Sequence, residues 1–380
     1  MRIQNLLLLV ILVIFLFSCS KDEIGGDHPG TVTISFKNDT VIGLNQTVTI
    51  EAVYTGSAAI THRWTVNDSL YATTARLVFK PPVAGLYTIT YSGKIGEVTY
   101  TEFLKVTAEP KIRPVTDTSS RFISRVYEYL PAPGQFMGES AGSLDGARSI
   151  IGDRTGLLSL GSFGGYVIFG FDHSIVNQAG ADLAIYGNPL PAPRDWSEPG
   201  IVLVSRDENE NGLPDDTWYE LAGSEYKNAS TIRNYSITYY NPRGMVNVPW
   251  KDNMGNTGVV EINEFHQHSY YPAFVANQDS LTFTGSRLPA TFGEQDGIYI
   301  NRAFAWGYAD NYATDATKDP YAVNRYNVFD LSWAVDRNGT VVSLRAIDFV
   351  KVYTGQNNKG YNLMGEVSTE ISGAADLNMR

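Results

Sequence analysis

One short segment carries oxygen-bearing side chains at alternate positions, as a Ca²⁺ loop does. Residues 207–218 read DENENGLPDDTW. A turning loop points every second side chain inward, so alternate oxygens wrap one cation, and Gly212 allows the sharp turn. The predicted ligands are four side chains and one backbone carbonyl: Asp207, Asn209, Asn211, Asp215 and Leu213. Trp218 stands where a bidentate acid is expected, so the pattern favours a structural Ca²⁺ clamp, with a polar hairpin as the alternative.

Two other groups could bind metal. Asp172, Asp182, Asn188 and Glu198 could share a second Ca²⁺ if they converge at strand ends, which the sequence does not show. His266 and His268 lie two apart, and on a strand such residues share a face. A transition-metal site needs a third or fourth ligand, and no motif supplies one. An imidazole could also bind the cobalt of a corrinoid, but a polar or stacking role beside Tyr270 is favoured.

Aromatic residues crowd the loop-like segments of the C-terminal part of the chain. Flat apolar rings beside amides and acids suit a sugar face or a large planar ligand. Trp218 and Trp333 have strand-like surroundings and are expected in the core. The predicted ligand contacts, with the histidines included, are Trp250, Asp252, Asn253, His266, His268, Tyr270, Trp306, Tyr308, Asp310 and Asn311.

The N-terminus predicts where these residues are displayed. Arg2 precedes an apolar run at 6–17, which is shorter than the roughly 18–20 residues of a membrane span and is typical of a secretory signal. The run ends at Ser18-Cys19, which resembles a bacterial lipobox. Cys19 is the only cysteine, which excludes an intrachain disulfide. The lipobox resemblance implies that Cys19 is lipidated and becomes the N-terminus of an outer-membrane lipoprotein. The acidic residues after it resemble a surface-export signal of Bacteroidetes lipoproteins.

The charge and the pattern of apolar and polar residues limit the function and the fold that the chain can have. With 29 basic and 40 acidic residues the chain is not built to bind nucleic acid by charge. Short segments alternate apolar and polar residues with turn residues between them, as in β-sandwiches. We predict an all-β protein: a small N-terminal sandwich followed by a larger, jelly-roll-like β-sandwich. The expected divisions are a signal peptide at 1–18, a tether at 19–30, a first domain at 31–108, a linker at 109–120 and a ligand-binding domain at 121–380.

Two resemblances add expectations. Trp64 in HRWTV and the segment FKPPVAGLYTITY resemble a PKD-like or Ig-like module, which places Trp64 between two sheets. The segments GGYVIFGFDHSIVNQAGADLAIYGN, EPGIVLVSRDENENGLPDDTWYELAGSEY and FDLSWAVDRNGTVVSLRAIDFVKVYTG resemble PKD-like "cell surface protein" lipoproteins of Bacteroidetes. That resemblance implies an accessory lipoprotein of a TonB-dependent transporter, with cobalamin as a possible ligand.

The sequence therefore predicts a surface lipoprotein that captures a cobalamin-type cofactor or a glycan without chemistry. The sequence contains neither a P-loop nor a His-Glu-x-x-His motif. Two alternatives stay open. A glycoside hydrolase or lyase could use a carboxylate pair that no spacing singles out, and an adhesion protein could use the sandwich to bind another protein.

Overall fold

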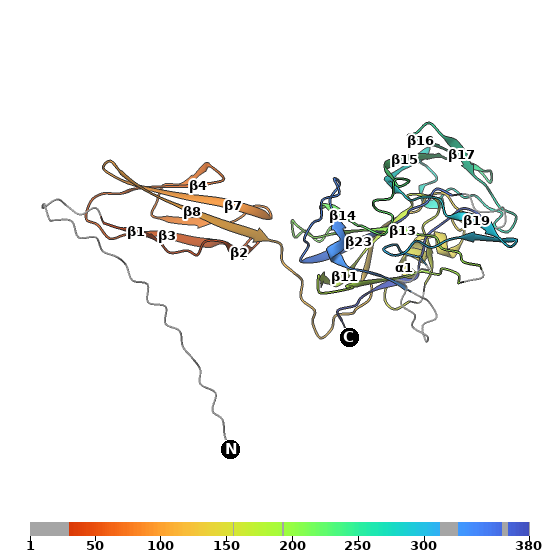
Figure 1. Ribbon diagram of the computed structural model, residues 1–380, viewed down its shortest axis with the longest axis horizontal. Coiled ribbons are helices and arrows are strands. Elements are labelled where there is room, and N and C mark those ends of the chain that lie inside the picture. The colour runs from red at the N-terminus through yellow and green to blue at the C-terminus, as the bar shows by residue number, and fades with distance from the viewer. Residues whose placement is uncertain (1–29, 155, 192–193, 312–325, 359–363, 380) are drawn as a thin grey trace, which may run out of the picture. The chain divides into compact units, whose positions relative to one another are not determined.

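The chain folds into two compact units, each built from β-strands (Figure 1). The computed structural model describes residues 30–154, 156–191, 194–311, 326–358 and 364–379. Cys19, the predicted signal peptide and the predicted tether up to residue 29 lie outside the described residues. The two units are Met1–Pro81 with Leu86–Thr107, and Pro82–Gly85 with Ala108–Arg380. Among the described residues, no helix has the length and apolar character needed to span a membrane.

The first unit consists of two sheets around an aromatic core. One sheet has the order β1 (Val32–Ile34), β3 (Val48–Tyr54) and β6 (Arg76–Phe79). The other has the order β2 (Thr40–Gly43), β8 (Val98–Glu109), β7 (Gly85–Ile95), β4 (Thr61–Val66) and β5 (Ser69–Ala72). Trp64 in β4 is fully buried, and its indole Nε1 donates to the Thr74 carbonyl at 3.0 Å. The tryptophan therefore lies in the core, as predicted.

The described residues of the second unit form three larger sheets and two short pairs. The six-stranded central sheet has the order β22 (Ala334–Val335), β14 (Trp218–Leu221), β13 (Gly200–Ser205), β23 (Ala346–Thr354), β11 (Tyr166–Val176) and β9 (Arg125–Leu130). A four-stranded sheet has the order β17 (Thr257–Val260), β16 (Val248–Asp252), β15 (Ile232–Tyr240) and β18 (Ser280–Arg287). A three-stranded sheet has the order β21 (Tyr326–Phe329), β12 (Leu183–Tyr186) and β25 (Gly373–Asp376). The pairs are β10 (Leu158–Ser159) with β24 (Glu370–Ile371), and β19 (Phe292–Gln295) with β20 (Ile298–Asn301).

The central sheet is covered on both faces, because successive side chains of a strand point in opposite directions. Val202 and Val204 of β13 join the core that contains Leu183 of β12. Ile201 directly precedes Val202 and points to the opposite face of the sheet. It joins a second core, which contains Ile237 of β15. The same alternation along β11 and β23 builds three stacked sheets with two cores between them.

The predicted fold class is confirmed: the structure is mostly β, sandwich-like and built from antiparallel sheets. Within residues 121–130 the structure forms one strand, β9 (Arg125–Leu130). Helical structure in the described residues is limited to α1 (Leu144–Ser149) and three single turns, η1 (Ser140–Gly142), η2 (Ala273–Val275) and η3 (Leu331–Trp333). Ser143 caps α1 by accepting a hydrogen bond from the Gly146 amide at 3.0 Å.

Residues within the expected linker 109–120 are held against the second unit. Arg113 donates from Nε to Asp348 Oδ1 at 3.1 Å and from Nη1 to the Phe171 carbonyl at 3.1 Å. Its backbone amide donates to Ser174 Oγ at 2.9 Å. Arg113 therefore tethers this segment to β11 and β23. The domain boundaries themselves stay a prediction.

Candidate ligand-binding cleft and polar clusters

A cleft of about 450 Å³ opens between the central sheet and the four-stranded sheet of the second unit. This volume falls within the roughly 300–1,000 Å³ of small-molecule sites. The central sheet supplies Tyr166, Trp218, Glu220, Lys351 and Tyr353, and the facing wall includes Arg233 of β15 and Ser286 of β18.

The strand period explains why these side chains meet. Trp218 and Glu220 are two apart on β14, and Lys351 and Tyr353 are two apart on β23, so each pair shares one face of its strand. Gly285 lets the facing sheet approach, since a Cβ there would lie 2.8 Å from the Tyr353 ring. Trp218 was expected in the core, and the structure corrects this: Trp218 is partly exposed and lines the cleft.

An ion pair between Arg233 and Glu220 fixes the positions of polar groups in the cleft. Arg233 Nη1 donates to both carboxylate oxygens of Glu220, at 3.3 and 3.1 Å, and the Arg233 guanidinium lies 3.5 Å from the ring centre of Tyr226. Ser286 Oγ donates to Glu220 Oε2 at 2.9 Å. Burial raises the pKa of Glu220, although Arg233 and Ser286 stabilise the charged form.

A second cation lies over an aromatic ring in the same cleft. Lys351 Nζ is 3.7 Å from the ring centre of Tyr166. Burial lowers the pKa of Lys351, and the Glu128 carboxylate partly opposes that effect. The cleft thus presents aromatic faces next to hydrogen-bonding groups of both charges.

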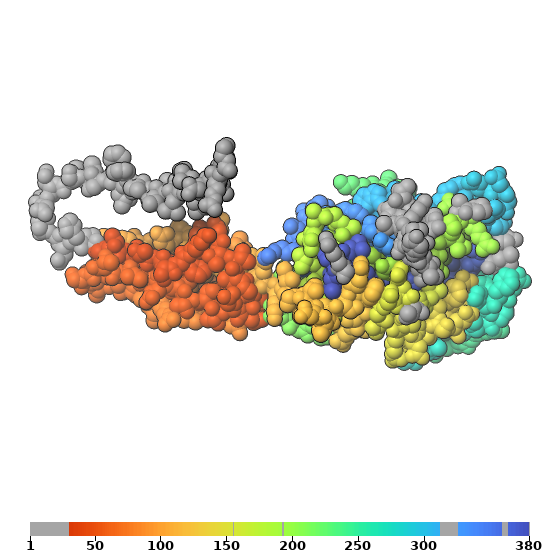
Figure 2. All heavy atoms as spheres, turned by 90° about the horizontal axis from the view of Figure 1, so that it is seen from below, coloured from red at the N-terminus to blue at the C-terminus, as the bar shows by residue number. Residues whose placement is uncertain are grey.

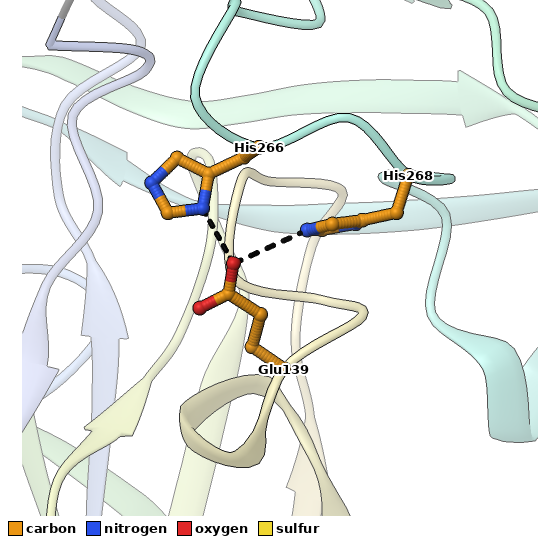
Figure 3. Close-up of side chains that lie close together, drawn as sticks. All are labelled: Glu139, His266 and His268. Carbon is orange, nitrogen blue, oxygen red and sulfur yellow. Dashed lines mark hydrogen bonds and ion pairs between the residues drawn. The ribbon is translucent and has the colours of Figure 1, made fainter.

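A separate cluster brings together two histidines and one acid from distant segments (Figure 3). His266 Nδ1 lies 2.5 Å from Glu139 Oε1, and His268 Nε2 lies 3.5 Å from the same oxygen. Glu139 precedes η1, and both histidines belong to the loop between β17 and η2. In Figure 2 the yellow segment around α1 lies beside the teal segment after β17, although Glu139 and His266 are 127 residues apart.

Three carboxyl groups meet at a third place. The nearest ligand atoms of Glu198, Asp310 and Glu370 lie within 4.8 Å of one another. Asp310 is fully buried, and it accepts from the Asn188 amide at 2.8 Å and the Glu370 amide at 2.9 Å. Burial, and then the neighbouring carboxyl groups, raise the pKa of Asp310 and Glu370 well above their usual range.

The second predicted acidic group is divided between two places. Asn188 and Glu198 meet at the carboxyl cluster, through Asp310. Asp172 accepts instead from His173 Nδ1 at 2.7 Å, and Asp182 accepts from the Leu331 amide at 3.1 Å. The four residues that could have shared a second Ca²⁺ therefore have different partners.

The predicted Ca²⁺ loop is a set of hydrogen-bonded turns. Asp207 accepts from the amides of Asn211 at 3.0 Å and Gly212 at 2.9 Å. Asn211 Nδ2 donates to Asp215 at 3.0 Å, and Asn209 Nδ2 donates to it at 3.1 Å. Gly212 has a φ of +74°, which explains the glycine at this position. The loop turns as the spacing predicts, and Ca²⁺ binding stays a prediction.

Several of the predicted ligand contacts face inward, which corrects the expectation that they lie on open loops. Asp252 accepts from the amides of Met254 and Asn256 at 3.0 and 2.7 Å, because it closes the turn between β16 and β17. Asn253 is exposed, yet its Oδ1 accepts from the Ser236 amide at 3.1 Å.

Three more of the predicted ligand contacts, besides Asp310, are buried and form internal hydrogen bonds. The Tyr270 hydroxyl accepts from the Asn263 amide at 3.0 Å, and the Tyr308 hydroxyl accepts from the Glu225 amide at 2.9 Å. Asn311 Oδ1 accepts from the Phe304 amide at 2.7 Å. All three side chains are buried and form part of the interior of the second unit.

Two predicted tryptophans keep accessible surface. Trp306 is 37% exposed and packs against Trp333, with ring centres 4.7 Å apart. Trp250 is partly buried and covers Gly258, where a Cβ would lie 2.5 Å from the indole. Both residues stay predicted ligand contacts.

No family model matches the chain, and no curated protein matches it. Solved structures share a distant similarity with it, and three of them show its extent. A quinoprotein alcohol dehydrogenase-like protein from Bacteroides thetaiotaomicron has 12% identity over 60% of this chain and 49% of that one, with a TM-score of 0.20. This chain therefore spans about half the length of that protein.

The other two structures match a larger share of both chains. A SusE-like protein has 7% identity over 91% of this chain and 96% of that one, with a TM-score of 0.21. A carbohydrate-binding module of the β-sandwich superfamily has 10% identity over 92% of this chain and 97% of that one, with a TM-score of 0.17. At these TM-scores the similarity carries no argument about what the chain binds.

Proposed function

We propose that the protein is a surface lipoprotein that captures a carbohydrate in the cleft between its central and four-stranded sheets, without chemical conversion. The observation that carries the proposal is the combination of Trp218, Tyr166 and Tyr226 with the Glu220–Arg233 pair in one cleft of about 450 Å³. A pyranose presents an apolar face to an aromatic ring and hydroxyl groups to charged partners.

The acids of the cleft support binding and not catalysis. A glycoside hydrolase needs two carboxyl groups on either side of the scissile bond, one of them able to give a proton. Glu220 is held by Arg233 and Ser286. Asp336, the other acid of the lining, accepts from the amides of Asn338 and Thr340 at 2.8 and 2.9 Å and so shapes its own turn. Both acids are better placed to position other groups than to act on a glycosidic bond.

Surface display and delivery complete the proposal. The lipobox-like Cys19 anchors the chain in the outer membrane, and a TonB-dependent transporter takes up the captured ligand. These two parts rest on the sequence resemblance alone. A cobalamin-type cofactor is the second ligand to test, since the same resemblance implies it.

The test is isothermal titration of the purified full chain with a panel of oligosaccharides and with cyanocobalamin. We expect saturable binding of at least one oligosaccharide, and a loss of affinity of at least tenfold, about 1.4 kcal/mol, in Trp218→Ala. Trp250→Ala serves as the matched control, because Trp250 lies on β16 and does not line the cleft.

Each of the other outcomes would indicate a different site, a different ligand or a different function. Binding that is lost in Trp250→Ala and kept in Trp218→Ala would move the site from the cleft to the aromatic loops. Saturable binding of cyanocobalamin alone would replace the carbohydrate. Release of shorter sugars during incubation would show an enzyme, and no binding to either ligand class would overturn capture.

A further inference from the structure

One buried nitrogen in the Glu139–His266–His268 cluster has no hydrogen-bond partner among the described residues. His268 Nε2 is buried, and it lies 3.5 Å from Glu139 Oε1, which is not a hydrogen bond. The other ring nitrogen, Nδ1, lies 3.2 Å from the Ser269 carbonyl oxygen, which accepts only from an N–H. In that tautomer Nε2 carries a lone pair, so two acceptors, an imidazole nitrogen and a carboxylate oxygen, face each other. A cation between them would satisfy both.

We infer that Glu139, His266 and His268 form a binding site for a divalent transition-metal ion, with Zn²⁺ the best fit. The three ligand atoms, Glu139 Oε1, His266 Nδ1 and His268 Nε2, all lie within 4.8 Å of one another. Metal–ligand bonds of about 2.0–2.2 Å in a tetrahedron separate ligand atoms by roughly 3.3–3.6 Å. The His268–Glu139 separation has this value, and the partly exposed Glu139 needs only a small side-chain rotation away from His266.

The ligand set selects the class of metal. Two imidazoles and one carboxylate suit Zn²⁺ and the late first-row ions, whereas Ca²⁺ and Mg²⁺ prefer oxygen ligands throughout. The His268 Nδ1 contact with a backbone carbonyl is the outer-shell bond that orients a metal-binding histidine. The site is independent of the proposed capture function.

The fold holds the two contributing segments in place before any ion binds. Asn263, which is 6% exposed, accepts from the His266 amide at 3.0 Å and donates from Nδ2 to Gln135 Oε1 at 2.6 Å. Asn263 thus links the histidine loop to the segment that carries Glu139. Gly138 gives His268 room, since a Cβ there would lie 2.6 Å from its Nδ1.

Three protein ligands leave one coordination position open. The side chains of Glu139, His266 and His268 are 42%, 22% and 26% exposed, so water reaches the cluster. Structural zinc sites are closed by four protein ligands, whereas sites with three exchange a water for another donor. The position is therefore suited to an exchangeable oxygen or nitrogen ligand.

The experiment is a titration of the purified full chain with Zn²⁺, followed by calorimetry and by metal analysis after dialysis. A Cys19→Ser background removes the only thiol, which would otherwise compete. We expect one equivalent of Zn²⁺ at micromolar affinity or better. His266→Gln and His268→Gln should each weaken binding at least a hundredfold. Asn263→Ala should weaken it tenfold or more through the loss of orientation.

His62→Ala is the matched control, because His62 bonds to the Tyr91 hydroxyl at 2.8 Å in the first unit and should not change zinc binding. Co²⁺ absorption gives a second readout, with the visible bands of a four-coordinate ion expected in the wild type and lost in both histidine variants. Circular dichroism shows that each variant is folded. An absence of saturable Zn²⁺ or Co²⁺ binding, or binding unchanged in His266→Gln and His268→Gln, would overturn the site and show a simple hydrogen-bonded cluster.

Discussion

Arg233 and Glu220 form an ion pair across the cleft of the second unit, in which one guanidinium nitrogen, Nη1, donates to both carboxylate oxygens. The Arg233 side chain is 35% exposed and that of Glu220 is 17% exposed, so the pair is only partly shielded from water. The same guanidinium also covers Tyr226. This pair therefore connects β14 of the central sheet to β15 of the facing sheet, and it fixes the charge pattern that a ligand meets.

Removing Arg233 should destabilise the second unit. Arg233→Met leaves the mostly buried Glu220 carboxylate without its cation, which should cost about 1–3 kcal/mol, less than for a fully buried pair. Urea unfolding measures the loss. The double variant Glu220→Gln/Arg233→Met should recover part of it, because no unpaired charge is left. A single variant within about 0.5 kcal/mol of the wild type would contradict this role.

Glu366 should make stability depend on pH. Burial raises its pKa to about 8, while its Oε1 accepts from the Gln135 amide at 2.8 Å. The folded chain therefore holds a proton that the unfolded chain releases above its ordinary pKa of about 4.5. This contribution is fully present below pH 4.5 and is lost as pH rises toward 8, by up to about 1.4 kcal/mol per pH unit.

The variant Glu366→Gln tests that dependence by thermal unfolding between pH 5 and 8. The wild type should lose stability as pH rises, and the variant should lose less. The exposed Glu294, changed to Gln, should behave as the wild type does. Parallel pH profiles for the wild type and Glu366→Gln would show that this carboxyl group is not the source.

Gly285 should be essential to the approach of the two cleft walls. A Cβ at this position would lie 2.8 Å from the ring of the buried Tyr353, whose hydroxyl accepts from the Ser286 amide at 2.8 Å. Gly285→Ala should therefore lower the free energy of unfolding by about 1–3 kcal/mol through overpacking. Gly293→Ala is the control, because nothing lies within 4 Å of its Cβ. Equal effects on the thermal transition would argue against the close approach.

The Asp207 loop should bind Ca²⁺ if the sequence prediction is correct. Calorimetry of the wild type with CaCl₂ should give saturable heat, and Asp207→Ala should abolish it by removing the first ligand of the loop. Glu208→Ala, in the same loop at a position that does not face the cation, should keep binding. A wild type without measurable heat of Ca²⁺ binding would rule out the metal and leave a hydrogen-bonded hairpin.

The sequence by itself determined the local structure of this protein. Alternation of apolar and polar residues along short segments predicted strands, because a period of two is imposed by the backbone of a single strand. The turn at Gly212 followed from equally local chemistry, whereas the burial of Trp64 followed from the resemblance to a PKD-like or Ig-like module. An all-β, sandwich-like fold was predictable for the same reason.

Only the tertiary structure decided which distant residues meet. Glu139 joins His266, Glu198 joins Asp310 and Glu370, and Trp218 faces Arg233, and no spacing in the sequence marks these groups. Tyr308 and Asp310 were predicted to be ligand contacts in open loops, yet they are buried. The physical reason is that alternation shows which face of a strand is apolar, but not which strand pairs with it or which loops lie together. Those choices depend on the packing of the whole unit.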